Sequence, residues 1–329
     1  MQLKDVYRPI KKELREVERV LEASLRQTNN ESILNLNRFL LESPGKRLRP
    51  ALVILSARAT NSHKPSTINH QLIKIASAIE LIHMASLIHD DVIDHSNSRH
   101  HRPTVNSKWG QDVSIALGDY LYSLAFKLIS TSDNPDILGC ISSATKSMCE
   151  GELIQVIERD NLSLMKRRYI LIVKKKTAGL FAASCQAGAI AADSSRPQEF
   201  ALKQYGLNFG IAFQIIDDYL DLASGEASLG KAPGQDIAVG ETTLPLLNLL
   251  ESVSQEKRRT LRNLLKSRNG DCLKKIRAEF VGSEAPGRTK RTALFYIDSA
   301  KEKLKLLSES VYRKRLFDLG DLILRRGFS

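Results

Sequence analysis

The 329-residue sequence contains few cysteines, few aromatic residues and no long uninterrupted apolar segment. Its four cysteines form no C-x-x-C pair, so the sequence shows no zinc-ligand spacing and no sign of a disulfide framework. We interpret them as ordinary thiols of a protein in a reducing compartment. No segment has the roughly eighteen consecutive apolar residues that a membrane-spanning helix needs. The first residues, M-Q-L-K-D-V-Y-R, carry early charges and lack the apolar region of a signal peptide. We therefore expect a cytoplasmic protein without a transmembrane segment.

The formal net charge of +12 first suggests a nucleic-acid-binding protein. The basic residues concentrate in residues 257–277 and 313–326, and no recognisable nucleic-acid-binding motif accompanies them. We interpret most of them as solvated helix faces and expect no nucleic-acid partner. Part of the excess charge suits an anionic ligand or a transient contact with a membrane surface.

The hydrophobic pattern predicts an almost entirely helical chain. In the first helix, apolar residues recur every three or four positions, at Leu3, Val6, Ile10, Leu14, Val17, Leu21 and Leu25. Further helices are predicted at residues 31–42, 50–60, 68–94, 111–130, 134–158, 164–192, 197–223, 240–252 and 291–324, with a loop or short helices over 267–290. No alternating strand pattern and no shift in composition stands out. The prediction is one all-α domain over residues 1–329.

Two copies of an acidic motif carry most of the functional information. D-D-V-I-D places Asp90, Asp91 and Asp94 after an apolar helical segment, and D-D-Y-L-D places Asp217, Asp218 and Asp221 after another. On a helix that turns by roughly 100° per residue, the first and last Asp of each motif share a face. Like charges this close are costly unless a cation neutralises them.

A single D-D-x-x-D is weak evidence, because solvated helix faces often carry such runs. The apolar flanks and the repetition favour function over that alternative. Hard oxygen ligands without zinc-like Cys or His spacing indicate Mg²⁺, which typically bridges carboxylates to substrate phosphates. Two facing clusters of this kind would form a clamp for a diphosphate.

With these motifs the chain resembles the trans-polyprenyl diphosphate synthases over nearly its whole length. The resemblance is carried by G-K-R-L-R-P from Gly45, E-L-I-H-M-A-S-L-I-H-D-D-V-I-D from Glu80, R-H-H-R-P-T from Arg99, K-T at Lys176, F-Q-I-I-D-D-Y-L-D from Phe213, G-K-A-P-G-Q-D from Gly230 and T-L-P from Thr243.

The resemblance implies an isoprenoid synthase fold of the class I terpenoid synthase type, a helical bundle around a central cavity. It implies condensation of isopentenyl diphosphate with an allylic diphosphate by ionisation, condensation and elimination, in a homodimer. The Mg²⁺ ligands it implies are Asp90, Asp91, Asp94, Asp217, Asp218 and, less firmly matched, Asp221. The positions matching the allylic diphosphate site are Arg99, Lys176, Thr177, Gln214 and Lys231, and those matching the isopentenyl diphosphate site are Lys46, Arg49 and His83. The residue types suit diphosphate, because Arg offers paired donors and Lys a compact charge.

Structural interpretations compete with several of these roles. Lys176 belongs to a run of three lysines, which is usually a solvated face. His83 lies among apolar residues, where a core histidine is the common case, and we interpret His89 as structural. Gln214 precedes Asp217 by three residues, so both are expected on one helix face.

The sequence departs from the family pattern at two places. Where the family has R-R-G after the first motif, this chain has Arg99, His100 and His101, and His100 is mostly neutral near pH 7 unless a diphosphate raises its pKa. We expect weaker isopentenyl diphosphate binding, or compensation by His101 or Arg102. Glu241 stands where the family has a diphosphate-facing lysine.

Product length in this family depends on residues just before the first motif. Ala85 and Ser86 are small here, which leaves a pocket open for roughly one to two helical turns, with Ile82 and Ile79 as a deeper floor. The alternative is that small residues merely permit helix packing. We favour a medium-to-long product over a geranylgeranyl- or farnesyl-length one, and a self-sufficient enzyme over a partner subunit of a heteromeric synthase.

Overall fold

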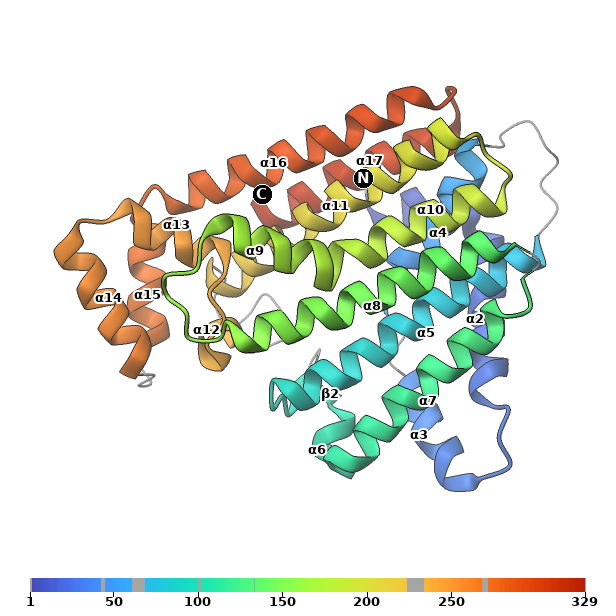
Figure 1. The fold of residues 1–329 in the computed structure, drawn as a ribbon, viewed down its shortest axis with the longest axis horizontal. Helices are drawn as coiled ribbons and strands as arrows, with labels where there is room; N and C mark the ends of the chain where they lie inside the picture. The colour runs from blue at the N-terminus through green and yellow to red at the C-terminus, as the bar shows by residue number, and fades with distance from the viewer. Residues whose placement is uncertain are drawn as a thin grey trace.

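The computed structural model describes residues 2–42, 45–60, 69–99, 102–132, 134–223, 234–267 and 272–328. Helices α5, α7, α8, α10, α11 and α16 run side by side along the longest axis, while α13, α14 and α15 lie together at one end (Figure 1). The architecture is an all-α bundle, as the sequence predicts.

The elements follow the apolar periodicity of the sequence. In chain order they are α1 (Leu3–Tyr7), η1 (Arg8–Ile10), α2 (Lys11–Leu25), α3 (Glu31–Leu41), α4 (Leu48–Thr60), α5 (His70–Ile93), β1 (Ser98–Arg99), β2 (Arg102–Pro103), α6 (Val105–Trp109), α7 (Gln111–Ile129), α8 (Pro135–Ile157), α9 (Lys166–Val173), η2 (Lys174–Ala178), α10 (Gly179–Ala191), α11 (Arg196–Ala223), α12 (Gln235–Val239), α13 (Leu244–Ser252), α14 (Gln255–Ser267), α15 (Cys272–Val281), α16 (Ala285–Lys303), η3 (Leu304–Leu306) and α17 (Val311–Phe328).

Several predicted boundaries were wrong. The first helix is interrupted by a 3-10 turn at Pro9, because proline lacks the amide hydrogen of a regular turn. The predicted helix over 291–324 is two helices, the one over 240–252 begins only at Leu244, and α14 was not predicted. A two-residue antiparallel ladder, β1 with β2, also lies in a region predicted to have no strand. Apart from α14, a helix of 13 residues, each error concerns a break or a short element, where periodicity carries little information.

Helix α5 is the centre of the bundle and is apolar on nearly every side. It packs against α2, α4, α7 and α10, and residues from Leu72 to Ala85 are largely buried. By length and composition α5 could cross a membrane, yet 67% of its most apolar window is buried within the protein, as in the core helix of a folded domain. Its apolar character is therefore accounted for by the core, and the aspartates at its end are held in place by that packing.

Helix α8 approaches the π-helical turn η2 closely because Gly151 has no side chain. A Cβ at Gly151 would come within 2.4 Å of the backbone nitrogen of Lys176. Gly210 on α11 likewise faces the backbone of Ala178, where an added Cβ would come within 2.7 Å of its Cα. These two contacts set the position of η2 between α8 and α11. Isolated π-turns inside helices often occur at functional sites.

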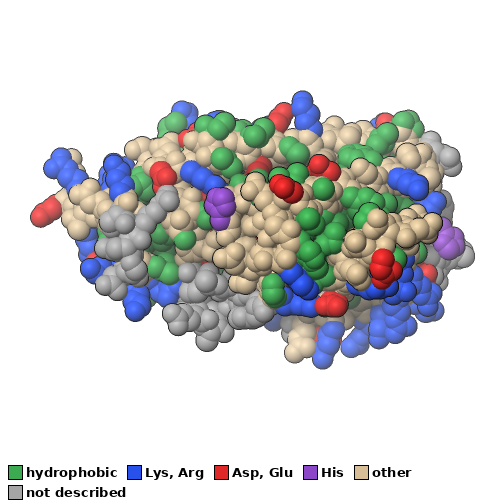
Figure 2. All heavy atoms as spheres, turned by 90° about the horizontal axis from the view of Figure 1, so that it is seen from below, with side chains coloured by type: hydrophobic (Ala, Val, Ile, Leu, Met, Phe, Trp, Pro, Cys, Tyr) green, Lys and Arg blue, Asp and Glu red, His purple; other side chains and the backbone are tan. Residues whose placement is uncertain are grey.

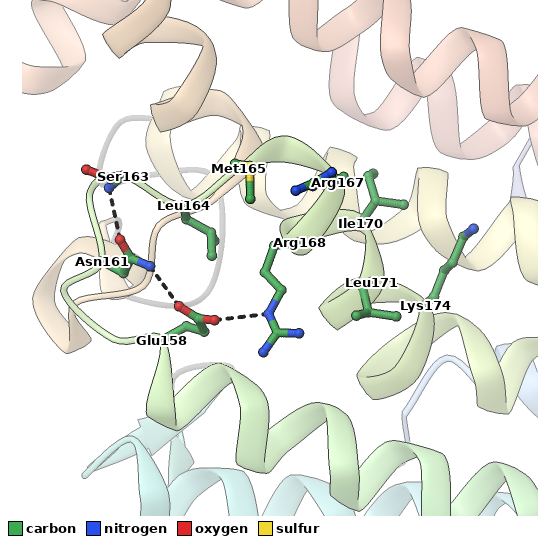
Figure 3. A pocket seen from close by; sticks show the side chains of 10 residues that line it. All are labelled: Glu158, Asn161, Ser163, Leu164, Met165, Arg167, Arg168, Ile170, Leu171 and Lys174. Carbon is green, nitrogen blue, oxygen red and sulfur yellow. Dashed lines mark hydrogen bonds and ion pairs between the residues drawn. The ribbon is translucent and has the colours of Figure 1, made fainter.

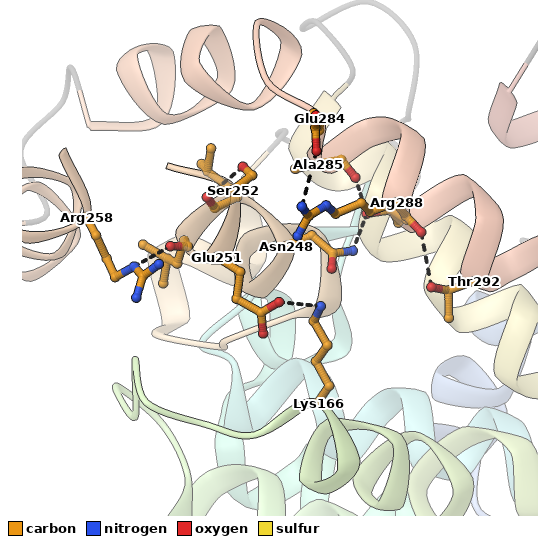
Figure 4. A network of polar contacts seen from close by, with 12 residues as sticks. Lys166, Asn248, Glu251, Ser252, Arg258, Glu284, Ala285, Arg288 and Thr292 are labelled. Atoms are coloured by element: carbon orange, nitrogen blue, oxygen red, sulfur yellow. Dashed lines mark hydrogen bonds and ion pairs between the residues drawn. The ribbon is translucent and has the colours of Figure 1, made fainter. Parts of the chain in front are cut away.

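A smaller apolar cluster joins the helices at the end of the bundle. It contains Leu249, Ile276 and Phe280, among others, and polar contacts tie it to the main body (Figure 4). Lys166 on α9 contacts Glu251 on α13 at 2.6 Å, and the buried Asn248 donates to Thr289 on α16 at 2.9 Å. Through these contacts α9 is fixed at its first turn.

The surface charge is unevenly distributed. On the face seen in Figure 2, Lys and Arg side chains gather toward one end, and apolar side chains form a band near the middle. The exposed residues of α1, η1 and α2 include Lys4, Arg8, Lys11, Lys12, Arg15 and Arg19. The basic excess is thus also present at the N-terminal helices, which the sequence analysis did not single out.

Candidate active site

The first aspartate motif lies at the C-terminal end of α5. The partial negative charge of a helix C-terminus disfavours carboxylates there, so cations are needed nearby. Arg99 contacts Asp91 at 2.8 Å through Nη2 and at 3.0 Å through Nε, and Arg159 contacts Asp94 at 2.6 Å. Arg99, one of the predicted ligand-binding residues, therefore touches the motif itself, while Arg159 was not predicted.

The second motif lies at the C-terminal end of α11 and is held mainly by neutral donors. The Tyr169 hydroxyl donates to Oδ2 of the buried Asp218 at 2.6 Å, and Nε2 of Gln214 donates to its Oδ1 at 2.7 Å. Asp221 accepts backbone N–H groups of residues 234–236, each at 3.2 Å. Asp217 contacts Arg326 of the C-terminal helix α17 at 2.8 Å. All three carboxylates are thus oriented by other elements.

Gln214 has two side-chain partners beside the second motif. It contacts Asp218, one helical turn on, and its Oε1 accepts from the Thr177 hydroxyl at 2.9 Å. Thr177, Gln214 and Asp218 therefore form a chain from η2 to α11. The structure brings two predicted allylic-site residues together with a predicted metal ligand.

The charges of both motifs act on Arg49, and that of the first motif acts on Lys176. Burial lowers the pKa of Arg49 to about 10, against the opposing effect of Glu80, Asp217 and Asp90. Because Asp90 and Asp217 both act on this one guanidinium, the two motifs face a common space. The guanidinium also lies 4.3 Å from the centroid of the Phe181 ring, a cation–π contact.

Lys176 contacts Glu152 on α8 at 2.5 Å and is not the solvated lysine of its run. Burial opposes its charge, but Asp90, Glu152 and Glu241 hold the pKa of Lys176 above its ordinary value. It is therefore a fixed cation at the edge of the first motif. Glu241, the departure from the family pattern, lies within reach of this lysine, and burial raises the pKa of its carboxyl.

Of the residues predicted for isopentenyl diphosphate, His83 lies near Arg49, and Lys46 lies near Arg326 and Asp217. Partial burial, with the neighbouring Arg326, lowers the pKa of Lys46. Burial, together with Arg49, Arg99 and Arg47, lowers the pKa of His83 well below its ordinary value, so this side chain is neutral near pH 7. A neutral His83 among arginines suits a hydrogen-bonding role beside an anion. His89 is structural, as expected: its Nε2 lies 3.2 Å from the carbonyl oxygen of Ile115.

Two predicted binding residues, Lys231 and His100, lie outside the described residues, as does His101. Arg102, the suggested substitute for the missing arginine, is described and contacts Glu42 at 2.6 Å. It also lies 5.7 Å from the centroid of the Phe39 ring. In this structure the guanidinium of Arg102 therefore contacts residues of α3 and its C-terminal cap.

Among the described residues no three acidic, His or Cys side chains converge closely enough to form a preassembled metal site. The donor set nevertheless fits a hard divalent cation, because it consists of carboxylate oxygens. Burial, with the nearby Glu241 and Asp217, raises the pKa of Asp218 to about 7, and burial with Asp90 raises that of Glu152 to about 7. This unfavourable accumulation of negative charge is what a bound cation would relieve.

Sequence reasoning missed Glu152, Arg159, Tyr169 and Arg326. Glu152 belongs to E-G-E-L-I-Q, a polar interruption of an apolar helix that could have been noticed. No local spacing relates Tyr169 or Arg326 to aspartates 49 residues or more than a hundred residues away. Their roles depend on packing between distant helices.

The predicted chain-length residues lie on the face of α5 that enters the bundle. Ala85 is fully buried, as are Ile82 and Ile79 one and two turns earlier. Ser86 is half-buried, and its hydroxyl donates to the His83 carbonyl at 2.9 Å. Tyr122 lies on α7, which packs against α5, and burial, with Cys149 and Asp90 nearby, raises the pKa of its hydroxyl.

Comparison with known proteins matches residues 30–280 to the polyprenyl synthetase family. The chain is 35% identical over 313 residues to a short chain isoprenyl diphosphate synthase of Methanothermobacter thermautotrophicus, covering 94% of each protein. It is 32% identical to the octaprenyl diphosphate synthase of Escherichia coli, over 92% of this chain and 94% of that enzyme.

The fold agrees with a crystal structure of a polyprenyl synthase from Caulobacter crescentus CB15 complexed with calcium and isoprenyl diphosphate. The TM-score is 0.93 at 31% identity, over 99% of this chain and 98% of the other. A divalent cation and an isoprenyl diphosphate are thus bound by a protein of the same fold. The chain belongs to the polyprenyl synthetase family and is a trans-prenyl diphosphate synthase, a prenyltransferase of isoprenoid biosynthesis.

Proposed function

We propose that this enzyme extends an allylic starter such as farnesyl diphosphate with isopentenyl diphosphate to a medium- or long-chain all-trans-polyprenyl diphosphate, using Mg²⁺. What supports the proposal is a space bordered by Arg49, which the charges of both Asp90 and Asp217 influence, and by Lys176, which the charge of Asp90 influences. Such a space binds a diphosphate through metal on one side and fixed cations on the other.

Asp90, Asp91, Asp94, Asp217 and Asp218 would hold the Mg²⁺ ions, with Asp221 contributing less because its oxygens accept three backbone N–H groups. When bound, Mg²⁺ supplies Lewis-acid stabilisation of the departing diphosphate. Tyr169 and Gln214 orient Asp218, and Lys176 and Arg99 add fixed positive charge where the leaving group gains negative charge.

His83, Arg49 and Lys46 would bind isopentenyl diphosphate on the opposite side. The guanidinium of Arg49 can donate two hydrogen bonds to phosphate oxygens. A neutral His83 can donate one more hydrogen bond without adding a second positive charge beside Arg49. The released diphosphate would accept the proton in the elimination step, so this proposal requires no dedicated side-chain base. Lys231 and His100 remain proposed substrate contacts on the strength of the motif match.

The product length is set by the side chains of α5 that precede the first motif and line the cavity for the growing chain. Small Ala85 and Ser86 leave about one to two helical turns open, and the family resemblance then favours about six to ten isoprene units. The serious alternative is a geranylgeranyl-length product, in which Ile82 or Tyr122 closes the cavity early. The two relatives differ in the same way, one being named short chain and the other octaprenyl.

We further propose a homodimer located in the cytoplasm, with α8 in the interface. Leu138, Leu153, Val156 and Ile157 of α8 are exposed apolar residues, and Cys149 on the same helix is exposed too. Exposed apolar residues on one helix, with Leu153, Val156 and Ile157 within about one turn, are typical of a protein interface. A partner subunit of a heteromeric synthase is less well supported, because both aspartate clusters are intact. Light scattering of the wild type and Leu153→Glu tests the dimer, which the charged variant should weaken.

The function is tested by incubating the purified protein with farnesyl diphosphate, labelled isopentenyl diphosphate and Mg²⁺, then resolving products by length. A ladder that ends beyond the geranylgeranyl length supports the proposal. A geranylgeranyl-length stop keeps the chemistry and refutes the role given to Ala85 and Ser86. No product from a folded protein refutes a self-sufficient synthase.

A further inference from the structure

A second pocket lies outside the aspartate site, between the end of α8 and helix α9 (Figure 3). Its volume is about 630 Å³, within the range of small-molecule sites. The lining residues are Glu158, Asn161, Ser163, Leu164, Met165, Arg167, Arg168, Ile170, Leu171 and Lys174. None of them belongs to the predicted substrate or metal set.

The lining carries three cationic side chains and one carboxylate. That carboxylate, Glu158, is already engaged by Arg168 at 3.0 Å and by the side-chain amide of Asn161 at 2.7 Å. In the described parts of the chain no carboxylate pairs with Arg167 or Lys174, and both are exposed. Figure 3 shows Glu158 and Arg168 together at one side and Lys174 at the other. The pocket therefore has uncompensated positive charge.

The rest of the lining is apolar and partly open to water. Met165 is 54% exposed and Leu171 is 36% exposed, while Leu164 is buried beneath them. An apolar surface beside unpaired cations is complementary to a molecule with an anionic head and a hydrocarbon tail. A purely polar anion would leave the apolar side chains uncovered.

The pocket is built on a rigid element. Its wall, α9, is anchored by the contact of Lys166 with Glu251 and by the hydrogen bond of the buried Tyr169 with Asp218. Lys174 begins η2, the turn that carries Lys176. A preformed site of this kind loses little conformational entropy when a ligand binds.

We infer that the α8–α9 pocket binds an amphiphile with a phosphate-type head, the head on Arg167 and Lys174 and the tail along Met165 and Leu171. Such a molecule could be a prenyl diphosphate released by the enzyme, which rests on the proposed function, or the headgroup region of an anionic phospholipid. Both sources share the chemistry that the pocket recognises.

The test compares two charge-matched variants in binding assays without turnover. One variant reverses Arg167 and Lys174 (R167E/K174E), and the control reverses Arg291 and Lys314 (R291E/K314E), which are exposed on α16 and α17. Binding of decyl phosphate is measured by calorimetry in EDTA, where the metal-dependent site is not competent. Co-sedimentation with phosphatidylcholine vesicles, with and without phosphatidylglycerol, is the second arm.

We expect the pocket variant to bind at least about tenfold more weakly than the control, the scale of one lost charge-assisted contact. Met165→Ser with Leu171→Ser should weaken decyl phosphate but leave inorganic phosphate unaffected. A selective loss with decyl phosphate supports a soluble ligand, and one confined to anionic vesicles supports a membrane source. Equal behaviour of both charge variants in both arms, or no binding by the wild type, overturns the inference. Since neither arm requires turnover, a failure of the proposed function would not mimic these results.

Discussion

The two aspartate motifs have the same sequence pattern but are stabilised in different ways. At the end of α5, Asp91 and Asp94 are paired with arginines. At the end of α11, Asp218 is buried and accepts from Tyr169 and Gln214, and Asp221 accepts from backbone N–H groups. Asp91 is itself buried and its partner Arg99 is 21% exposed, so the motifs differ in the kind of partner rather than in exposure. An arginine that pairs with a carboxylate can be replaced by another cation, whereas a buried set of neutral hydrogen bonds fixes geometry. We infer that the first motif adapts to the metal and substrate, while the second provides a fixed frame.

The largest expected effect comes from neutralising one carboxylate in each motif. Asp91→Asn and Asp218→Asn should each lower kcat by about a hundredfold or more, because each removes a charged ligand of the Mg²⁺ that would stabilise the leaving diphosphate. They should differ in stability. In Asp218→Asn the new NH₂ group faces a donor, Tyr169 or Gln214, and such a buried mismatch costs about 1–3 kcal/mol.

Kinetics and thermal unfolding of the two variants check this pair of expectations. If Asp91→Asn were as destabilising as Asp218→Asn, the distinction between an adaptable and a fixed motif would be wrong.

Ala85→Phe changes the cavity below the first motif and leaves both clusters intact. The added ring should fill the space one turn beneath Asp90 and shorten the main product by several isoprene units, while isopentenyl diphosphate is still consumed. Ala85→Ser, which adds little volume, is the matched control. Chromatography of the dephosphorylated products gives the answer, and an unchanged length for Ala85→Phe removes this residue from the cavity floor.

Tyr169→Phe removes a single hydrogen bond from the second motif without changing shape. Hydrogen bonds to charged groups contribute about 1.5–3 kcal/mol, so we expect kcat to fall about tenfold and the unfolding temperature to drop. Tyr312→Phe on α17 serves as the control, since this tyrosine packs against the core and, among the described residues, its hydroxyl makes no hydrogen bond. Wild-type activity in Tyr169→Phe would show that Asp218 needs no positioning from α9.

The smallest effect is predicted for Arg159→Gln at the first motif. Arg159 competes with a metal ion for Asp94, so its removal should lower the Mg²⁺ concentration for half-maximal activity by a few-fold, about 1 kcal/mol or less for a partly exposed pair. Initial rates across a Mg²⁺ titration measure this. A higher Mg²⁺ requirement in the variant would mean that Arg159 helps to form the metal site.

Much of the fold could be predicted because the long helices are strongly periodic. Helices α3, α5, α7, α8 and α11 begin and end within about two residues of the predicted limits. The break at Pro9, the π-turn at Lys174 and the separation of α16 from α17 could not be located so well. The break at Pro9 follows from the proline itself, whereas the other two depend on how neighbouring helices pack, as the approach of Gly151 to Lys176 illustrates.

The site could be predicted where its residues form motifs and could not where they meet only in space. The aspartates, Lys176 and Gln214 are marked by local sequence, and the structure brings them together. Tyr169 and Arg326 contact the second motif from α9 and α17, and no motif in the sequence next to either residue indicates this contact. Gln214 contacts Asp218 on its own helix and Thr177 on η2. Helical spacing alone does not specify these two partners.

The central claim is that both motifs bind one diphosphate through shared divalent cations. Its most direct test is the unfolding temperature with Mg²⁺ and a non-reactive thiolo analogue of farnesyl diphosphate, added separately and together. The account predicts a large rise only when both are present, and loss of that rise in both Asp91→Asn and Asp218→Asn. A full rise in either variant, or one that persists in EDTA, would contradict it.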